Sequence, residues 1–308
     1  MKVIFDDKKE KILVRQVDGR VMEVIFYDSL LNNIYRGKIV NKIDSLSSYF
    51  VEISDDENLF LKSSLSYAIG DNAIVEYVRE PANGKLGLAS ENFILENESY
   101  KLSRYPLKAK AKRKAGKKKD DILFKELNDK KAWLINQEKF YPSPKLLIEN
   151  SIKDSYLKKY EYYKLSEIDI RNSLVFTNLI KELKESKLAY KDLSIIIDEL
   201  ETLTVIDVNT GSRKSKMLKE DFLLGINLEL IDFIAHNLKL RNIGGMCLID
   251  FLRVNNQEKI TEEMQKAIDK YQIEAEIFGF TKMGLFEISI KRRGDSLKKA
   301  LRKRKLFS

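Results

Sequence analysis

Two apolar stretches that each contain one aspartate decide the fold of this chain: LTVIDVNTG at Leu203–Gly211 and MCLIDFL at Met246–Leu252. Each stretch is short and dominated by aliphatic residues, which is typical of buried strands. Between them, Lys219–Arg241 has apolar side chains along one helical stripe, and Gly244 and Gly245 follow where the end of a helix favours glycine. The sequence therefore predicts a strand–helix–strand unit.

The positions of the two aspartates predict a metal site. A strand–helix–strand crossover makes its strands parallel, so Asp207 and Asp250, both late in their strands, emerge at the same edge of the sheet. If the strands are neighbours, about 5 Å separates them, and ionised carboxylates that close repel each other. A divalent cation relieves the repulsion, and oxygen ligands favour Mg²⁺, with Mn²⁺ as the alternative, over Zn²⁺. Asn209 lies on the same face, where it either ligates the metal or holds Asp207 by its amide.

The loop after Asn209 indicates what such a site would act on. It carries hydroxyl groups and cations, including Arg213 and Lys214, directly after the predicted metal ligand. A metal that activates water, with cations that hold a phosphate, suits cleavage of a phosphodiester. The structural alternative stays open, because an aspartate at the end of a strand often forms an Asx turn or caps a helix.

Further strands are predicted on both sides of this unit. Ile195–Ile197 precedes it, and Glu274–Phe280 and Leu285–Ile290 follow it as a pair joined by a turn. Near the N-terminus, Asp18-Gly19 is a two-residue hairpin signal between two more strands. Residues 123–190 have a mostly helical pattern.

Residues 32–92 predict a small closed barrel. These residues contain five short predicted strands, and the OB type of barrel is a common nucleic-acid-binding domain of this size. The predicted strands are Ile34–Asn41, Ser48–Ile53, Asn58–Leu61, Ala73–Arg79 and Leu86–Ser90. Tyr49, Val51 and Ile53 share one face, so Phe50, and Phe60 on the next strand, are either exposed rings on which bases stack or residues at the edge of the core.

The charge of the chain is concentrated in two basic tracts. The chain has 308 residues and a net charge of +9, yet residues 108–119 hold eight basic residues and no acid, and residues 291–308 hold nine with one acid. Such tracts on an otherwise mildly acidic body favour a polyanionic partner, nucleic acid before membrane. Lys112, Arg113 and Lys114 are the candidate RNA contacts there. The alternative is that both tracts are solvated tails.

Rare residues exclude several classes of protein. The single cysteine, Cys247, leaves no disulfide framework and no structural zinc site. The single histidine, His236, rules out cleavage of RNA by a pair of histidines within one chain, and it lies inside the predicted helix, where we expect a structural role. The chain has no phosphate loop, no signal peptide and no membrane span, so we expect a cytoplasmic protein.

These motifs together resemble the ribonuclease E/G family of bacteria. The runs LTVIDVNTG, LRNIGGMCLIDF and GFTKMGLFEISIKRR look like the family's catalytic core, and NNIYRGKIV, YFVEI, LFLKSS and GKLGLAS look like its OB-type RNA-binding domain. The resemblance implies a mixed α+β and α/β fold. A ribonuclease-H-like domain (residues 1–30 and 123–200) is interrupted by the OB barrel (31–100) and a basic loop (101–122). A deoxyribonuclease-I-like catalytic domain (201–292) and a basic C-terminal tail (293–308) follow.

The resemblance also implies roles for individual residues. Asp207 and Asp250 match the two magnesium-binding aspartates, and Asn209 matches the asparagine that positions the first. Phe50, Phe60 and Lys85 match the RNA-contacting positions of the barrel. The implied reaction is magnesium-dependent endonucleolytic cleavage of single-stranded RNA to 5′-phosphate and 3′-hydroxyl ends, in RNA processing or decay.

The sequence departs from the family in several places. The stretch for a sensor of the RNA 5′-monophosphate is largely missing, and Glu274 stands where the family has a sensor arginine. The paired-cysteine zinc motif and the C-terminal dimerisation domain are also missing, so we expect a monomer or weak dimer and no zinc-linked tetramer. Two alternatives remain: an RNA-binding adaptor with weak or no cleavage, and a factor associated with ribosomes or rRNA precursors.

Overall fold

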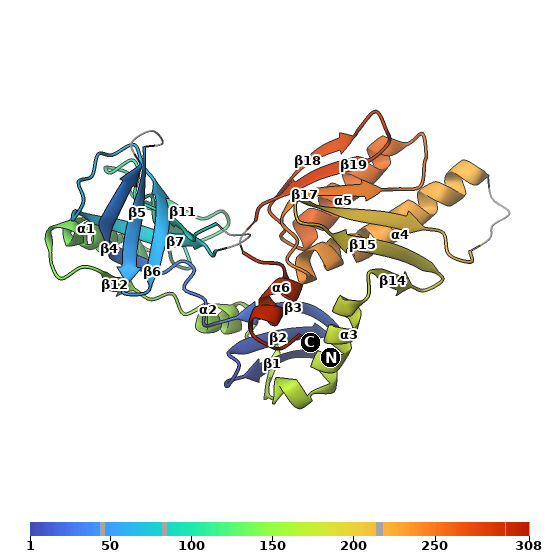
Figure 1. The fold of residues 1–308 in the computed structure, drawn as a ribbon, viewed down its shortest axis with the longest axis horizontal. Helices are drawn as coiled ribbons and strands as arrows, with labels where there is room; N and C mark the ends of the chain where they lie inside the picture. The colour runs from blue at the N-terminus through green and yellow to red at the C-terminus, as the bar shows by residue number, and fades with distance from the viewer. Residues whose placement is uncertain (44–46, 82–84, 214–217, 293, 308) are drawn as a thin grey trace. The chain divides into compact units, whose positions relative to one another are not determined.

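The chain folds as two compact units, one inserted into the other. The computed structural model describes residues 1–43, 47–81, 85–213, 218–292 and 294–307. The first unit comprises Met1–Asp28 and Lys153–Ser308, and the second comprises Ser29–Ile152 (Figure 1). The second unit thus continues to Ile152, beyond the boundary at residue 122 that the sequence suggested.

The centre of the second unit is a closed, OB-like barrel of five strands. These are β4 (Ile34–Ile43), β5 (Ser48–Ser54), β6 (Glu57–Lys62), β7 (Asn72–Arg79) and β8 (Leu88–Ser90). Their order is β4-β5-β6-β8-β7, and pairing of β7 with β4 closes the barrel. Tyr49, Val51 and Ile53 are buried as the alternation predicted. Gly37 is needed where β4 crosses β5, because a Cβ there would lie 2.3 Å from Cγ1 of Val51.

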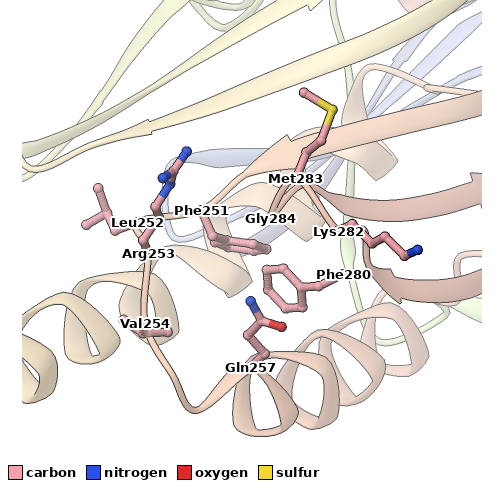
Figure 2. A pocket seen from close by; sticks show the side chains of 9 residues that line it. All are labelled: Phe251, Leu252, Arg253, Val254, Gln257, Phe280, Lys282, Met283 and Gly284. Carbon is pink, nitrogen blue, oxygen red and sulfur yellow. The ribbon is translucent and has the colours of Figure 1, made fainter.

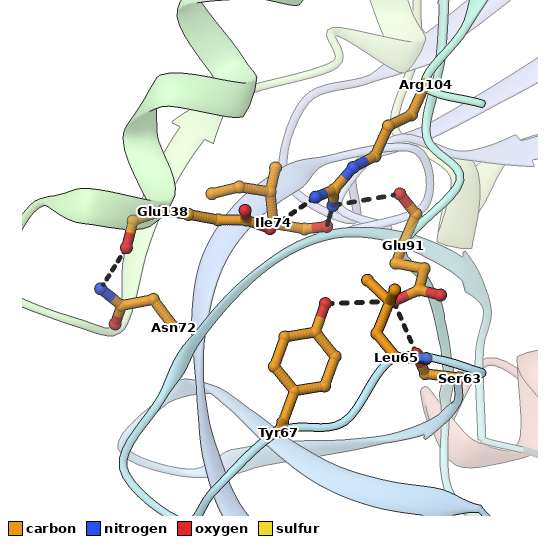
Figure 3. A network of polar contacts seen from close by, with 8 residues as sticks. All are labelled: Ser63, Leu65, Tyr67, Asn72, Ile74, Glu91, Arg104 and Glu138. Carbon is orange, nitrogen blue, oxygen red and sulfur yellow. Dashed lines mark hydrogen bonds and ion pairs between the residues drawn. The ribbon is translucent and has the colours of Figure 1, made fainter. Parts of the chain in front are cut away.

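A second layer packs on the barrel. It contains β9 (Ile94–Glu96), β10 (Tyr100–Ser103), β11 (Lys112–Arg113), α1 (Asp121–Asn136), the 3₁₀ helix η2 (Gln137–Lys139) and β12 (Lys145–Ile148), which pairs with β4. Figure 3 shows the polar contacts that join this layer to the barrel. The buried Arg104 donates hydrogen bonds to the backbone oxygens of Ile74 and Glu91 and pairs with Glu138 at 2.6 Å.

The basic tract of residues 108–119 is attached to this layer at several points. Lys131 of α1 donates hydrogen bonds to the backbone oxygens of Pro106 and Ala109 at 3.2 and 3.0 Å. Lys114 donates to the backbone oxygen of Asn97 at 2.7 Å. The segment that the sequence suggested as a basic loop therefore contains the short strand β11 and has fixed contacts.

The first unit contains a four-stranded sheet in the order β13-β1-β2-β3. Its strands are β1 (Lys2–Asp7), β2 (Ile12–Val17), β3 (Arg20–Phe26) and β13 (Lys164–Glu167), and its helices are α2 (Ile152–Lys159), the 3₁₀ helix η3 (Ile170–Asn172), α3 (Leu174–Lys184) and α6 (Leu297–Lys303). Asp18 and Gly19 both have positive φ in the predicted hairpin turn. The segment expected to be a basic tail instead forms α6, because Leu297, Leu301 and Phe307 bury themselves with Ile12 and Val14.

The first unit also contains a six-stranded sheet in the order β14-β15-β16-β17-β19-β18. Its strands are β14 (Lys187–Tyr190), β15 (Leu193–Glu199), β16 (Leu203–Asn209), β17 (Gly245–Asp250), β18 (Ala275–Phe280) and β19 (Phe286–Ile290). The helices α4 (Lys219–Leu240) and α5 (Gln257–Lys270) share one core with the buried side chains of the sheet, such as Ile206, Ile249 and Phe286. None of the helices in the described ranges is long and apolar enough to cross a membrane.

Candidate functional site

The two aspartates lie opposite each other on neighbouring strands. β16 and β17 pair in parallel, and Asp207 and Asp250 are partners in that register. Their chain neighbours Ile206 and Ile249 are fully buried toward the helices. Because side chains alternate along a strand, both carboxylates face the side of the sheet away from α4 and α5. The structure confirms that the strands are parallel neighbours and that the two acids meet at one edge.

Asn209 acts on the first of these carboxylates. Its Nδ2 donates a hydrogen bond to Oδ2 of Asp207 at 2.6 Å. This contact holds one carboxylate oxygen, and Oδ1 has no hydrogen bond from any residue in the described ranges, so Asp207 has a defined orientation before any ligand binds. Of the two roles that the sequence allowed for Asn209, this hydrogen bond is the contact expected for the one in which its amide holds Asp207.

The charge of the pair is not neutralised by the protein. No described lysine or arginine forms an ion pair with Asp207 or Asp250, although the two carboxylates are cross-strand neighbours. Within the described ranges, no group of three or more His, Cys, Asp or Glu side chains could hold a metal ion. The donor set is therefore two carboxylates beside one amide. It fits Mg²⁺, which binds proteins through one or two carboxylates and takes water and phosphate oxygens for the rest.

The predicted phosphate-binding loop is arranged differently from the expectation. Arg213 forms ion pairs with Asp192 and Glu229, and its Nε donates to Oδ2 of Asp192 at 2.8 Å. Its hydrogen bonds lower the pKa of both carboxyl groups. Arg213 therefore anchors the loop, and its charge is already compensated. Lys214, the other predicted cation, lies outside the described residues.

One residue that the sequence reasoning missed fixes the chain after Asp250. Asn227 of α4 is fully buried, and its side chain bonds Leu252 in both directions. Its Nδ2 donates to the backbone oxygen of Leu252 at 2.8 Å, and its Oδ1 accepts from the backbone nitrogen at 3.0 Å. A polar residue on the apolar stripe of the predicted helix was the available signal.

The predicted RNA contacts of the second unit are on its surface. Phe50 and Phe60 are cross-strand partners, half-buried on the face opposite Tyr49, and their ring centroids are 6.2 Å apart. Lys85, Lys112 and Arg113 are exposed.

Two of the positions named in the sequence analysis already form ion pairs. Lys114 pairs with Glu96 at 3.3 Å in the second unit. In the first unit, Glu274, which stands where the related family has a sensor arginine, pairs with Lys291 at 2.8 Å.

His236 has the structural role that its position predicted. Arg20 donates to Nδ1 of His236 at 2.7 Å, so the ring proton is on Nε2, which donates to the backbone oxygen of Val21 at 2.8 Å. Burial and the nearby Arg20 lower the pKa of His236 to about 4. The ring is therefore neutral near pH 7. Cys247 is buried, and burial raises the pKa of its thiol to about 12.

Comparison with known proteins links this site to one family. The model of the Ribonuclease E/G family matches residues 113–293, which is more than half of the chain. Ribonuclease G of Escherichia coli (strain K12) is 33% identical over 110 residues, 35% of this chain and 22% of that protein. Ribonuclease E of Synechocystis is 38% identical over 106 residues, 33% of this chain and 16% of that protein. The chain thus aligns with less than a quarter of the length of these relatives.

Proposed function

Because the chain belongs to the ribonuclease E/G family, we propose that it is an endoribonuclease whose reaction centre is the Asp207–Asp250 pair. The observation that carries the proposal is the register of β16 and β17, which sets two uncompensated carboxylates side by side on the face of the sheet away from the helices. The relatives are named Ribonuclease G and Ribonuclease E. For this chain we propose internal cleavage of single-stranded RNA, in RNA processing or decay.

The proposed cofactor is Mg²⁺, with Mn²⁺ as the alternative. Asp207 and Asp250 would hold it, and no structural zinc is proposed. When bound, the metal supplies Lewis acidity and offsets the negative charge of the phosphodiester. Asn209 keeps Asp207 oriented through its amide, which avoids the cost of ordering that carboxylate during the reaction. Attack of water on phosphorus and departure of the 3′ oxygen leave a 5′-phosphate and a 3′-hydroxyl.

The second unit supplies the proposed RNA-binding surface. The outward rings of Phe50 and Phe60 are platforms on which bases stack, and Lys85, Lys112 and Arg113 contact the phosphate backbone. In this proposal the six-stranded sheet is the deoxyribonuclease-I-like part and the four-stranded sheet the ribonuclease-H-like part. A cytoplasmic location, a monomer or weak dimer, and association with rRNA precursors remain predictions.

A cleavage assay tests the proposal. An end-labelled, AU-rich single-stranded RNA is incubated with the protein in magnesium or in EDTA, and with the variants Asp207→Asn and Asp250→Asn. We expect internal cuts that require magnesium and that fall more than about a hundredfold in either variant, since several kcal/mol of charge stabilisation are lost. RNA affinity should change little, because the proposed backbone contacts lie elsewhere.

A matched control uses Asp198→Asn. Asp198 is an exposed aspartate on β15, opposite Val205 of β16, so it lies on the same face of the sheet. It should cut like the wild type. Cutting by Asp250→Asn at the wild-type rate would refute the metal site. Tight binding without any cutting, on RNAs with 5′-monophosphate and 5′-triphosphate ends alike, would favour an RNA-binding adaptor.

A further inference from the structure

A pocket begins at the residue that follows Asp250. It lies between the loop Phe251–Val254, Gln257 at the start of α5, and the turn of the β18–β19 hairpin, and its volume is about 280 Å³ (Figure 2). We call it the edge pocket. Phe251 directly follows Asp250 in the chain, so the edge pocket borders the strand end that carries the candidate metal site. Its size is near the lower limit of ligand pockets, about 300 Å³, and suits one flat group.

The floor of the edge pocket is aromatic. The rings of Phe251 and Phe280 lie at its centre in Figure 2, with centroids 6.2 Å apart. Both rings contact Phe286, at 5.7 and 5.2 Å, which fixes them to the core of the sheet. Phe251 is buried, whereas Phe280 is half-exposed and offers its ring to a ligand. An anchored aromatic ring is a stacking surface for any nucleobase.

The polar groups around the floor match a nucleotide. The exposed Gln257 points its amide toward the two rings, with one donor and one acceptor that can read the edge of a base. Arg253 and Lys282 are exposed on opposite sides of the edge pocket. Neither forms an ion pair with any carboxylate in the described part of the chain. Two uncompensated cations beside an aromatic floor favour an anionic, flat ligand.

The walls of the edge pocket are held in place. Asn227 fixes Leu252 by two hydrogen bonds, as described above. In the hairpin turn, the hydroxyl oxygen of Thr281 accepts from the backbone nitrogens of Met283 and Leu285 at 3.2 and 3.1 Å. This turn carries Lys282 and Met283 at the border of the edge pocket, and their side chains extend away from the rings (Figure 2). Because its walls are already ordered, the pocket loses little conformational entropy when a ligand binds.

We propose that the edge pocket binds the base of a nucleotide adjacent to the phosphate that is cut, and so gives the enzyme a nucleotide preference at that position. Phe280 stacks on the base, Gln257 reads its edge, and Arg253 and Lys282 hold the flanking phosphates. The carboxylates face the open side of the sheet and the edge pocket lies toward α5, so the RNA crosses the sheet edge between them. This inference rests on the proposed function only in placing the bound base next to the phosphate that is cut.

Photocrosslinking tests base binding without cleavage. Short single-stranded RNAs, each with one thiouridine at a different position, are bound to the full chain in EDTA and irradiated, and the crosslinked peptides are identified by mass spectrometry. We expect crosslinks to residues 251–257 or 280–284 from a limited window of positions.

Phe280→Leu should lower RNA affinity about fivefold or more through lost stacking. Met283→Ala, at a 79% exposed residue, cannot unfold the core and should reduce the same crosslinks.

Cleavage of a random-sequence RNA pool tests the preference. We expect Gln257→Ala to reduce the nucleotide preference at one position beside the cut about fivefold or more, while other positions keep theirs. Gln265→Ala is the control, a glutamine two turns further along α5 that bonds Asp269. Normal cutting with unchanged preference and no crosslink at the edge pocket would overturn this inference alone. Crosslinks there without any cutting in magnesium would instead refute the proposed function and retain the base site.

Discussion

Single residues in this molecule show three different treatments of a charged or titratable group. Asp207 and Asp250 stay uncompensated beside each other, whereas Arg213 is balanced by two carboxylates and His236 is kept neutral. The first arrangement costs repulsion and is typical of a binding site. The second and third stabilise the fold around it.

His236 makes the stability of the protein depend on pH. Its pKa is about 4 in the folded chain and about 6.5 when unfolded, so the unfolded chain binds more protons between these values. The free energy of unfolding should therefore fall as the pH falls from 6.5 toward 4, with about 2 kcal/mol lost by pH 5. Urea unfolding at several pH values measures this loss.

The variant His236→Gln isolates that contribution. Glutamine can accept from Arg20 and donate to Val21 but does not titrate, so its unfolding free energy should depend less on pH in this range. Other residues facing His236, including Asp232 and Arg15, are present in both proteins. Identical pH profiles for the wild type and the variant would contradict the assignment.

At the scale of elements, the crossover from β16 through α4 to β17 positions the site. α4 contributes more than a covering layer, because its buried Asn227 also fixes the chain immediately after β17. The helix thereby connects its own packing to the orientation of the strand end that carries Asp250.

Replacing Asn227 should affect both stability and cleavage. Asn227→Ala leaves the N–H and C=O of Leu252 without partners, at a cost of about 1–3 kcal/mol for each buried group. Asn237→Ala is the matched control, a fully buried asparagine of the same helix whose Nδ2 bonds the backbone oxygen of Phe233. At a temperature where circular dichroism shows both variants folded, only Asn227→Ala should cut RNA more slowly. Equal cutting by the two variants would argue against a positioning role.

The elements that the sequence predicted well are those with strong local patterns. The alternation in Tyr49–Ile53 and the apolar runs of β16 and β17 carry their own signal, so the barrel strands and the pair of aspartates could be predicted. The helices α5 and α6 were missed because charged residues dominate them, and only a narrow stripe, such as Ile260 and Met264, is buried. The edge pocket could not be predicted, because Gln257 and Phe280 meet only through tertiary packing.

At the scale of the whole molecule, the proposed tasks are divided between the two units. The uncompensated aspartates belong to the first unit, and the exposed basic tract and outward aromatic rings belong to the second. Affinity for RNA and the rate of the chemical step should therefore be separable by mutation.

Removing charge from the basic tract tests that separation. We expect the triple change of Lys110, Lys112 and Arg113 to serine to weaken RNA binding and to reduce the slope of log affinity against log salt by about 2, since each lost phosphate contact contributes about 0.7. Cleavage at saturating RNA should stay near the wild-type rate. The control variant replaces three exposed lysines of the first unit with serine, namely Lys181, Lys184 and Lys187. It removes the same charge and should leave the slope unchanged. An unchanged slope in the first triple variant would show that the tract does not touch phosphates.

The insertion of one unit into the other sets an order of events during synthesis on the ribosome. β1 pairs with β13, which lies beyond the inserted unit, and Ile12 and Val14 of β2 pack against Leu297 and Leu301 of α6. β1 and β2 must therefore wait until β13 and α6 have been synthesised, while the barrel can close as soon as its own residues emerge. A chain that is still being synthesised therefore has the proposed RNA-binding surface before the proposed reaction centre, so we expect it to bind RNA before it can cleave RNA.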